Sequence, residues 1–277
     1  VPVCMSERLA DQTAVITGSS SGIGAAIATK FAEEGANVVT NSRALERAET
    51  TAEEITDAGG NAIAIEADIS DPDEAEYLVE RAVEEYGSLD IMVNNAGVSV
   101  VGPTMEMDPE DWQHVIDVNL SGVFYSAQAA GRQMIEQGTG GQMINISSMF
   151  GSVGIQGRTP YNASNGGVNT LTKCLAVELA EIDISVNAMA PGYIVTELTN
   201  QTRESDDRWT VLDRDDWPYY GYDDVHIENR TPMGRFGTLE EMQNVALFLA
   251  EGNNYITGEV ITPDGGWSAF GWGSKAQ

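Results

Sequence analysis

Short apolar runs and longer amphipathic segments alternate along most of this chain. Apolar, β-branched runs predict buried strands, and an apolar spacing of helical period predicts helices between them. The predicted strands are Thr13–Thr17, Asn37–Asn41, Ala62–Glu66, Ile91–Asn94, Gln142–Ile146, Ile184–Ala188 and Val260–Thr262, and the predicted helices are Gly22–Glu34, Ala44–Ala58, Pro72–Tyr86, Pro109–Glu136, Tyr161–Ala180 and Leu239–Ala250.

This alternation predicts an α/β fold: a doubly wound, mostly parallel sheet of about seven strands with helices on both faces. A length of 277 residues fits one large α/β domain or two small ones. Because no proline- or serine-rich linker and no internal repeat divides the sequence, we expect a single domain over residues 1–277.

Residues 197–235 depart from this rhythm, because they show little apolar periodicity. A long loop inside a compact domain is usually functional or disordered, and aromatic side chains argue against disorder. We therefore expect a lid over a substrate, with a subunit contact as a compatible alternative. The aromatic and imidazole side chains of this segment are Trp209, Trp217, Tyr219, Tyr220, Tyr222 and His226.

The charge of the chain is strongly negative: 43 acidic residues against 14 basic ones give a net charge of −29. Such a surface repels nucleic acid and anionic membranes, so we expect neither as a partner. An ordinary acidic enzyme is one interpretation. We favour a halophilic protein, since the Debye length falls to about 3 Å at 1 M salt and self-repulsion is then screened.

The two cysteines, Cys4 in the N-terminal tail and Cys174 on a predicted apolar helix face, are interpreted as reduced thiols. The first residues lack a basic start followed by an apolar run, and no stretch reaches about 18 apolar residues. We expect neither an export signal nor a membrane span, and a cytoplasmic location.

A glycine-rich turn, Thr17-Gly18-Ser19-Ser20-Ser21-Gly22-Ile23-Gly24, joins the first predicted strand to the first helix. Glycine permits positive φ and close backbone approach, and a helix N-terminus offers N–H groups to a pyrophosphate. The sequence therefore predicts a dinucleotide site. Its expected contacts here are Gly18, Ser19, Ser21, Gly22, Ile23 and Gly24.

The second predicted strand ends at the position that usually distinguishes NAD from NADP. An acidic residue there binds the ribose hydroxyls of NAD, but this chain has Ser42 followed by Arg43. An arginine fork fits a 2′-phosphate, and Ser19 offers a hydroxyl. NADP is predicted, with NAD as the alternative if Arg43 is only a solvated surface residue.

Ser148 precedes Tyr161 by thirteen residues, and Tyr161 opens the run Tyr161-Asn162-Ala163-Ser164-Asn165. This pattern resembles the Y-x-x-x-K signature of the short-chain dehydrogenase/reductase family, with Asn165 in the place of lysine. The spacing of the glycine turn, the run Asn94-Asn95-Ala96-Gly97 and the segment Pro191-Gly192 with Thr196 resemble the same family. Together these matches span residues 13 to about 266.

The resemblance implies an oxidoreductase that interconverts a hydroxyl and a carbonyl. In it Tyr161 is the acid/base, Ser148 orients the substrate oxygen, Asn119 supports a water relay and Asn165 faces the nicotinamide ribose. It also implies a homotetramer formed through the long helices that contain Asn119 and Tyr161. The implied cofactor contacts, besides the glycine turn, are Ser42, Arg43, Asp68 at the adenine, Asn95, Ala96, Gly97, Tyr161, Asn165, Pro191, Gly192, Ile194 and Thr196.

Asn165 removes a charge from this implied site. Residues four apart share one helix face, and the family's lysine helps the tyrosine to ionise and holds the ribose. An amide can still hydrogen-bond a ribose hydroxyl, but it supplies no charge. We expect a loss of about ten- to a thousandfold at neutral pH. Lys173 lies about 18 Å along the helix from Tyr161, and Lys30 belongs to the first helix, so neither replaces it.

Three explanations of Asn165 stay open: an engineered change that traps an inactive complex, a natural variant with slow or alkaline-shifted activity, or a dinucleotide-binding or sensing protein without catalysis. The residue types alone do not separate them.

The substrate prediction depends on aromatic rings interleaved with acids, as in Asp215–Tyr220, which suit the apolar faces and hydroxyls of a sugar or polyol. Acids of a halophilic surface are the alternative interpretation. A 3-oxoacyl or other small carbonyl substrate is less favoured, because acyl carriers are acidic and residues 197–235 hold ten acids and five arginines. The expected substrate contacts are Ser148, Gln156, Tyr161, Tyr193 and Trp217, with Ser99 nearby. No metal is expected.

Overall fold

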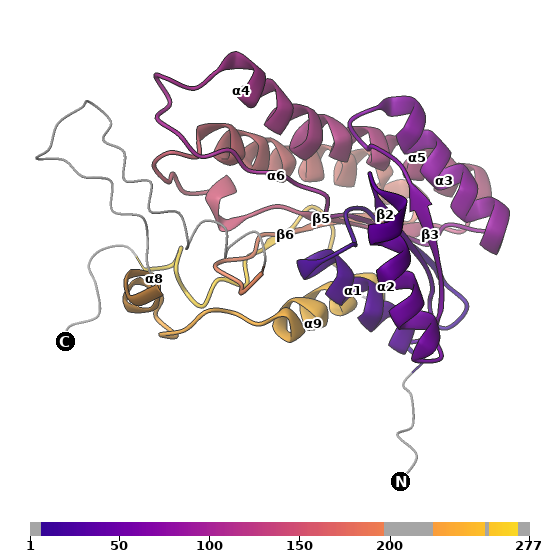
Figure 1. Cartoon of the computed structure of the whole chain (residues 1–277). Coiled ribbons are helices and arrows are strands. Elements are labelled where there is room, and N and C mark those ends of the chain that lie inside the picture. Colours follow the sequence, from indigo (N-terminus) through magenta and orange to yellow (C-terminus); the bar gives the residue numbers. More distant parts are fainter. Residues whose placement is uncertain (1–6, 197–223, 253–254, 271–277) are drawn as a thin grey trace, which may run out of the picture.

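The computed structural model describes residues 7–196, 224–252 and 255–270 (Figure 1). Its seven strands form one parallel sheet in the order β3-β2-β1-β4-β5-β6-β7, which confirms the predicted fold class. The strands are β1 (Thr13–Ile16), β2 (Asn37–Ser42), β3 (Asn61–Glu66), β4 (Ile91–Asn94), β5 (Gly141–Ile146), β6 (Ile184–Met189) and β7 (Val260–Ile261).

Helices cover both faces of this sheet in a single domain (Figure 1). One apolar core joins Ile27 and Phe31 of α1 (Gly22–Glu33) to Leu247 of α9 (Leu239–Ala250), with Ile55 of α2 (Leu45–Asp57) beside them. The second core lies under α3 (Pro72–Tyr86), α5 (Gly122–Gln137) and α6 (Thr159–Leu179), and α4 (Pro109–Ile116) contacts α6. Two short 3-10 turns, η2 (Met149–Gly151) and η3 (Ala180–Ile182), flank α6.

The predicted continuous helix Pro109–Glu136 is wrong in one respect. A π-helical turn, η1 (Asp117–Ser121), separates α4 from α5. Both ends of the Asn119 amide bond the main chain of Val98 at 2.8 Å, so a contact distant in sequence accompanies the bulge. Sequence periodicity does not register such a contact.

The prediction of an irregular segment over residues 197–235 is wrong for its last part. Residues 224–230 form the helix α8 (Asp224–Arg230), which buries Ile227 against Met149, Phe150 and Trp267. One buried residue in a helix this short leaves no periodic signal. Residues 197–223, with Trp217, lie outside the described residues.

Two further expectations concern the cysteines and a membrane span. Cys174 is exposed rather than set on an apolar helix face, and Cys4 lies outside the described residues. None of the helices in the described residues is long and apolar enough to cross a membrane.

The strand order reverses between β1 and β4, which have helices on opposite faces after them. In doubly wound folds the loops diverge at such a reversal, and ligands bind beyond the carboxyl ends of the strands there. The fold therefore places the glycine turn after β1 beside the loops after β4 and β5.

Candidate active site

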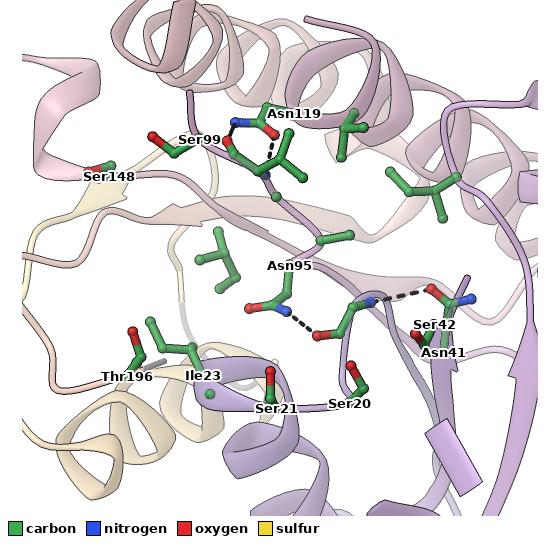
Figure 2. Close-up of a pocket in the computed structure, with 18 of the residues that line it drawn as sticks. Ser20, Ser21, Ile23, Asn41, Ser42, Asn95, Ser99, Asn119, Ser148 and Thr196 are labelled. Atoms are coloured by element: carbon green, nitrogen blue, oxygen red, sulfur yellow. Dashed lines mark hydrogen bonds between the residues drawn. The ribbon is translucent and has the colours of Figure 1, made fainter. Parts of the chain in front are cut away.

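A cleft of about 510 Å³ occupies this position. Figure 2 shows Ser20, Ser21, Ile23 and Thr196 on one side of it and Ser99, Asn119 and Ser148 on the other. The remaining lining residues come from the carboxyl ends of β1 to β6, from the loops that follow them, and from α1, α2, η1 and α6: Gly18, Gly22, Asn41, Ser42, Arg43, Arg47, Ala67, Asp68, Ile69, Asn95, Ala96, Gly97, Val98, Val118, Ile146, Ser147, Tyr161, Asn165, Pro191, Gly192 and Ile194.

The glycine turn is packed against the loop after β4. Gly18 has φ +61°, and a Cβ there would lie 2.7 Å from Ala96 Cα, so only glycine fits. Asn95 Nδ2 donates to the carbonyls of Thr17 and Gly18 at 2.9 and 3.1 Å. A Cβ on Gly24 would lie 2.3 Å from the same Nδ2, so the absence of a side chain at Gly24 permits this packing. Gly24 was expected to contact the dinucleotide, but it does not line the cleft.

The first turn of α1 is left open toward the cleft. Ser21 occupies the N-cap position without a side-chain cap, and the turn contains no acidic residue. The amide N–H groups of a helix start attract a phosphate under these conditions. The positive-φ glycine cradle and this turn therefore fit the pyrophosphate of a dinucleotide.

Ser19 was expected to contact the cofactor, and the structure places it elsewhere. Its side chain is fully buried, donating to Ile16 O at 2.8 Å and accepting from Asn41 N at 2.9 Å. It holds β1 to β2 and does not line the cleft, whereas the neighbouring Ser20 does. Because Ser19, Ser20 and Ser21 are consecutive and identical, the sequence does not indicate which hydroxyl is buried and which faces the cleft.

The far end of the cleft carries two arginines and an acid. Arg43 Nη1 lies 4.0 Å from Asp68 Oδ2, and Asp68 Oδ1 accepts from the N–H and hydroxyl of Ser70 at 3.0 and 2.7 Å. Burial opposes the charged form, but these hydrogen bonds and the Arg43 charge lower the pKa of Asp68. Arg47, which sequence reasoning missed, lines the same end. Arg47 follows Arg43 by four residues near the start of α2, and this spacing could have predicted that both arginines lie at the same place.

Ser148 and Tyr161 line the other end together. Ser148 Oγ accepts from Phe150 N at 3.2 Å at the start of η2, so its own hydroxyl proton can be donated elsewhere. Tyr161 lies in the first turn of α6 and packs beside Phe150. The two residues that the sequence paired therefore line the same cleft, and their roles stay a prediction.

Asn165, one turn after Tyr161, also lines the cleft but points its amide back onto its own helix. Nδ2 donates to the Tyr161 carbonyl at 2.8 Å, and the side chain is 5% exposed. The Asn165 carbonyl accepts from Ser147 Oγ at 3.2 Å. The side-chain amide therefore bonds back to the preceding turn of α6, and its Oδ1 atom can still accept a hydrogen bond.

Among the described residues, only Arg43 and Arg47 bring positive charge to the cleft lining. Lys173 is exposed on α6 and does not line the cleft. Lys30 pairs with Glu34 at 2.8 Å and Glu33 at 3.3 Å, and the hydrogen bond to Glu34 raises the pKa of Lys30 most. Neither lysine takes the place that Asn165 leaves neutral.

Asn119 reaches the cleft from the π-helical turn η1. Its amide bonds Val98 in both directions and approaches Ser164 Oγ at 3.5 Å. The side chain thus holds the loop after β4 against η1, and its part in a water relay stays a prediction.

Two predicted substrate contacts do not line the cleft. Tyr193 makes edge-on contacts with Phe150, Phe236 and Trp267 at centroid distances of 5.8, 6.2 and 5.2 Å, so it belongs to an aromatic cluster. Gln156 is exposed in the loop before α6. Ser99, which was expected nearby, does line the cleft, and substrate contact by Tyr193 and Gln156 stays a prediction.

Comparison with known proteins agrees with this geometry. The sequence profile described as short chain dehydrogenase matches residues 12–207. The chain belongs to the short-chain dehydrogenase/reductase family. It is 39% identical over 257 residues to a 3-oxoacyl-[acyl-carrier-protein] reductase of Staphylococcus aureus (92% of this chain, 97% of the relative). It is 38% identical over 269 residues to glucose 1-dehydrogenase 2 of Bacillus subtilis (96% and 98%).

A solved member of the family has the same overall structure. It is a gluconate 5-dehydrogenase from Burkholderia cenocepacia in complex with NADP and tartrate, with a TM-score of 0.84 and 34% identity over 96% of this chain and 98% of the other. The short-chain dehydrogenase fold is thus shared along nearly the whole chain, and the family binds a nicotinamide dinucleotide.

Proposed function

We propose that this chain is an NADP-preferring oxidoreductase that interconverts a hydroxyl and a carbonyl on a sugar or polyol, with activity weakened by Asn165. The observation that carries the proposal is one cleft lined by the glycine turn, Ser148 and Tyr161. The bound nicotinamide supplies the hydride acceptor or donor. Tyr161 takes up or returns the hydroxyl proton, and Ser148 donates to the substrate oxygen.

The preference for NADP follows from the charge at the far end of the cleft. Ser42, Arg43 and Arg47 line it together, and guanidinium groups match a phosphate in charge and in fork geometry. The NADP in the solved gluconate 5-dehydrogenase supports the same preference. Asp68 lies 4.0 Å from Arg43 and partly neutralises its charge. We therefore expect Arg47, which forms none of the ion pairs among the described residues, to contribute to phosphate binding as well.

The weakened activity follows from the neutral amide at Asn165. An ammonium near a phenol favours its ionised form, and removing it costs about ten- to a thousandfold near neutral pH. The amide keeps a role in cofactor binding through hydrogen bonds to the nicotinamide ribose.

A sugar or polyol substrate is supported by the glucose and gluconate dehydrogenases among the relatives. The 3-oxoacyl reductase at 39% identity favours a second candidate, reduction of a carrier-bound 3-oxoacyl group. A net charge of −29 opposes the docking of an acidic carrier protein, so we place this candidate second. We also propose that residues 197–235 form a lid over the substrate. The chain is further proposed to form a homotetramer and to be located in the cytoplasm.

The test is cofactor reduction in molar salt at pH 9–10, with NADP⁺ and a panel of aldoses and polyols. Slow reduction is expected from the wild type and none from Tyr161→Phe, which binds NADP⁺ equally well. The 3-oxoacyl thioester is assayed separately, by oxidation of NADPH. NADP⁺ binding without turnover of any polyol or aldose, and without NADPH oxidation by the thioester, would contradict catalysis and leave a dinucleotide-sensing protein. Turnover of the thioester alone would select the second candidate.

A further inference from the structure

A row of buried polar side chains crosses the sheet toward α6, on the face of the second apolar core. Side chains alternate between the two faces of a strand, so Asn94 and Asn145 share the face of the core methionines two residues before them. The two asparagines pair in register on β4 and β5. Together with Thr172 of α6 they are at most 1% exposed. The row therefore lies wholly inside the protein.

Each member of this row is hydrogen-bonded to the next. Asn94 Nδ2 donates to Asn145 Oδ1 at 2.8 Å, and Asn145 Nδ2 donates to Thr172 Oγ1 at 2.9 Å. The Thr172 hydroxyl in turn donates to Val168 O, one turn back on α6, at 2.8 Å. Because this hydroxyl both accepts and donates, it is held in one orientation. Buried polar groups joined in this way fix the geometry of a core more narrowly than apolar contacts do.

A second bond holds α6 nearer its N-terminal end. Ser147, two residues beyond Asn145, donates from its Oγ to Asn165 O at 3.2 Å. Asn165 precedes Thr172 by seven residues, which is about two helical turns. The turn η2 packs at the same level, because a Cβ on Gly151 would lie 2.8 Å from Asn165 O. Two fixed points therefore determine the rotation of α6 about its axis and its position along that axis.

The two fixed points lie on the side of α6 that carries Tyr161. Thr172 follows Tyr161 by eleven residues, about three turns, so both side chains leave the helix in nearly the same direction. Ser148, which begins η2, directly follows Ser147. A rotation of α6 at Thr172 would therefore move Tyr161 relative to Ser148.

The other end of the row lies beside the glycine turn. Asn94 is followed by Asn95, whose Nδ2 donates to the carbonyls of Thr17 and Gly18 at 2.9 and 3.1 Å. Because Asn95 holds the turn through these bonds of its own, loss of the Thr172 hydroxyl at the far end of the row should leave the turn in place.

We propose that Asn145 and Thr172 are positioning residues, whose hydrogen bond sets the rotation of α6 that brings the Tyr161 hydroxyl to the substrate oxygen. Neither residue lines the cleft, so both act through Tyr161. This inference rests on the proposed function, in which Tyr161 is the acid/base. A displacement of about 1 Å at a reacting group can cost about a hundredfold in rate, so the bond should affect turnover more than cofactor binding.

The first measurement needs no turnover. Protein labelled with 3-fluorotyrosine is observed by fluorine NMR in its NADP⁺ complex, and the Tyr161 signal is identified by its loss in Tyr161→Phe. Ser148→Ala should shift this signal in the wild type. The same shift should be largely lost in Thr172→Val and retained in Thr172→Ser and Thr170→Val. Thr170 is the matched control, because it is exposed on α6 and its hydroxyl also donates to the carbonyl one turn back.

The second measurement is the rate of NADP⁺ reduction with a substrate that the panel identifies. Thr172→Val should lower kcat about ten- to a hundredfold and leave the dissociation constant of NADP⁺ unchanged. Thr172→Ser should restore most of kcat, and Thr170→Val should match the wild type. Asn145→Ala should also lower kcat, and combining it with Thr172→Val should add little, because both changes remove the same hydrogen bond. Every variant is assayed below its Tm, measured by circular dichroism.

The proposal is overturned if Ser148→Ala leaves the Tyr161 signal of the wild type unchanged, or if Thr172→Val keeps the full shift or the full kcat. It is also overturned if Thr172→Ser behaves like Thr172→Val, or if Thr172→Val weakens NADP⁺ binding as strongly as it lowers kcat, since Thr172 would then only stabilise the fold. Failure of the proposed function is a separate result. Absence of turnover in every protein, Asn165→Lys included, would contradict catalysis, whereas the fluorine signals would still decide how Tyr161 is positioned.

Discussion

At the scale of single residues, the cleft separates binding from chemistry. Arg43 and Arg47 give its far end positive charge, whereas Asn165, at the reacting end, donates its amide proton to the Tyr161 carbonyl at 2.8 Å. A dinucleotide is therefore expected to bind well in a site that moves a proton poorly. The two properties can be tested separately, because the arginines that would bind the 2′-phosphate are not the residues that would move the proton.

The cofactor preference is tested by Arg43→Gln and Arg47→Gln. Each is expected to weaken NADP⁺ about ten- to a hundredfold and NAD⁺ hardly at all, because only the 2′-phosphate needs the guanidinium. Dissociation constants from fluorescence titration of both cofactors give the result, with Arg81→Gln on α3 as the control. Equal losses for NADP⁺ and NAD⁺ would contradict the assignment.

At the scale of elements, the sequence predicted the seven strands and most helices because apolar periodicity and burial agree there. β1 and β4 are buried along their whole length, as their apolar runs indicate. The π-helical turn η1 escaped prediction because it goes with the contact between Asn119 and Val98, 21 residues apart. α8 escaped because Ile227 alone anchors it.

The parts of the site that depend on backbone conformation and on motif spacing were predictable from the sequence. Gly18 needs positive φ, and Ser148 and Tyr161 follow at a spacing that the fold converts into one cleft. Side-chain direction was not predictable, since contacts distant in sequence fix it: Ser19 is buried against Asn41, and Tyr193 packs edge-on against Trp267.

The start of α9 provides a prediction at this scale. Thr238 and Glu241 form a reciprocal capping box, and Arg235 Nη2 lies 2.6 Å from Glu241 Oε1. The hydrogen bond from Arg235 is the main cause that lowers the pKa of Glu241 to about 2. The ionised carboxylate therefore stabilises the fold above pH about 4.5, and this contribution is lost as the pH falls toward about 2.

Glu241→Gln should accordingly lower the free energy of unfolding by at most about 1 kcal/mol at pH 7, because the pair is solvent-screened. The difference from the wild type should shrink steadily below pH about 4.5. Urea unfolding between pH 7 and pH 3 measures it, with Glu240→Gln as the control for the loss of one surface charge. A difference independent of pH would contradict the assignment.

At the scale of the whole molecule, a net charge of −29 makes self-repulsion a general destabilising contribution. We expect the Tm to rise with KCl, most steeply below about 1 M, where the Debye length shrinks to about 3 Å. A variant with Glu49, Glu53, Glu76 and Glu80 changed to Gln, all exposed on α2 and α3, should show a smaller rise. Circular dichroism melts give both slopes. A Tm that is flat or falling with salt would contradict the halophilic interpretation.

The central claim is that the family's machinery is complete in this chain except for one positive charge beside Tyr161. Its most direct test is the rate of NADP⁺ reduction by the wild type and by Asn165→Lys at pH 7 and pH 10, with a substrate that the panel identifies. The lysine should raise the rate about ten- to a thousandfold at pH 7, and by less at pH 10, where a phenol ionises unaided. Equal rates for the two proteins at pH 7 would contradict the claim.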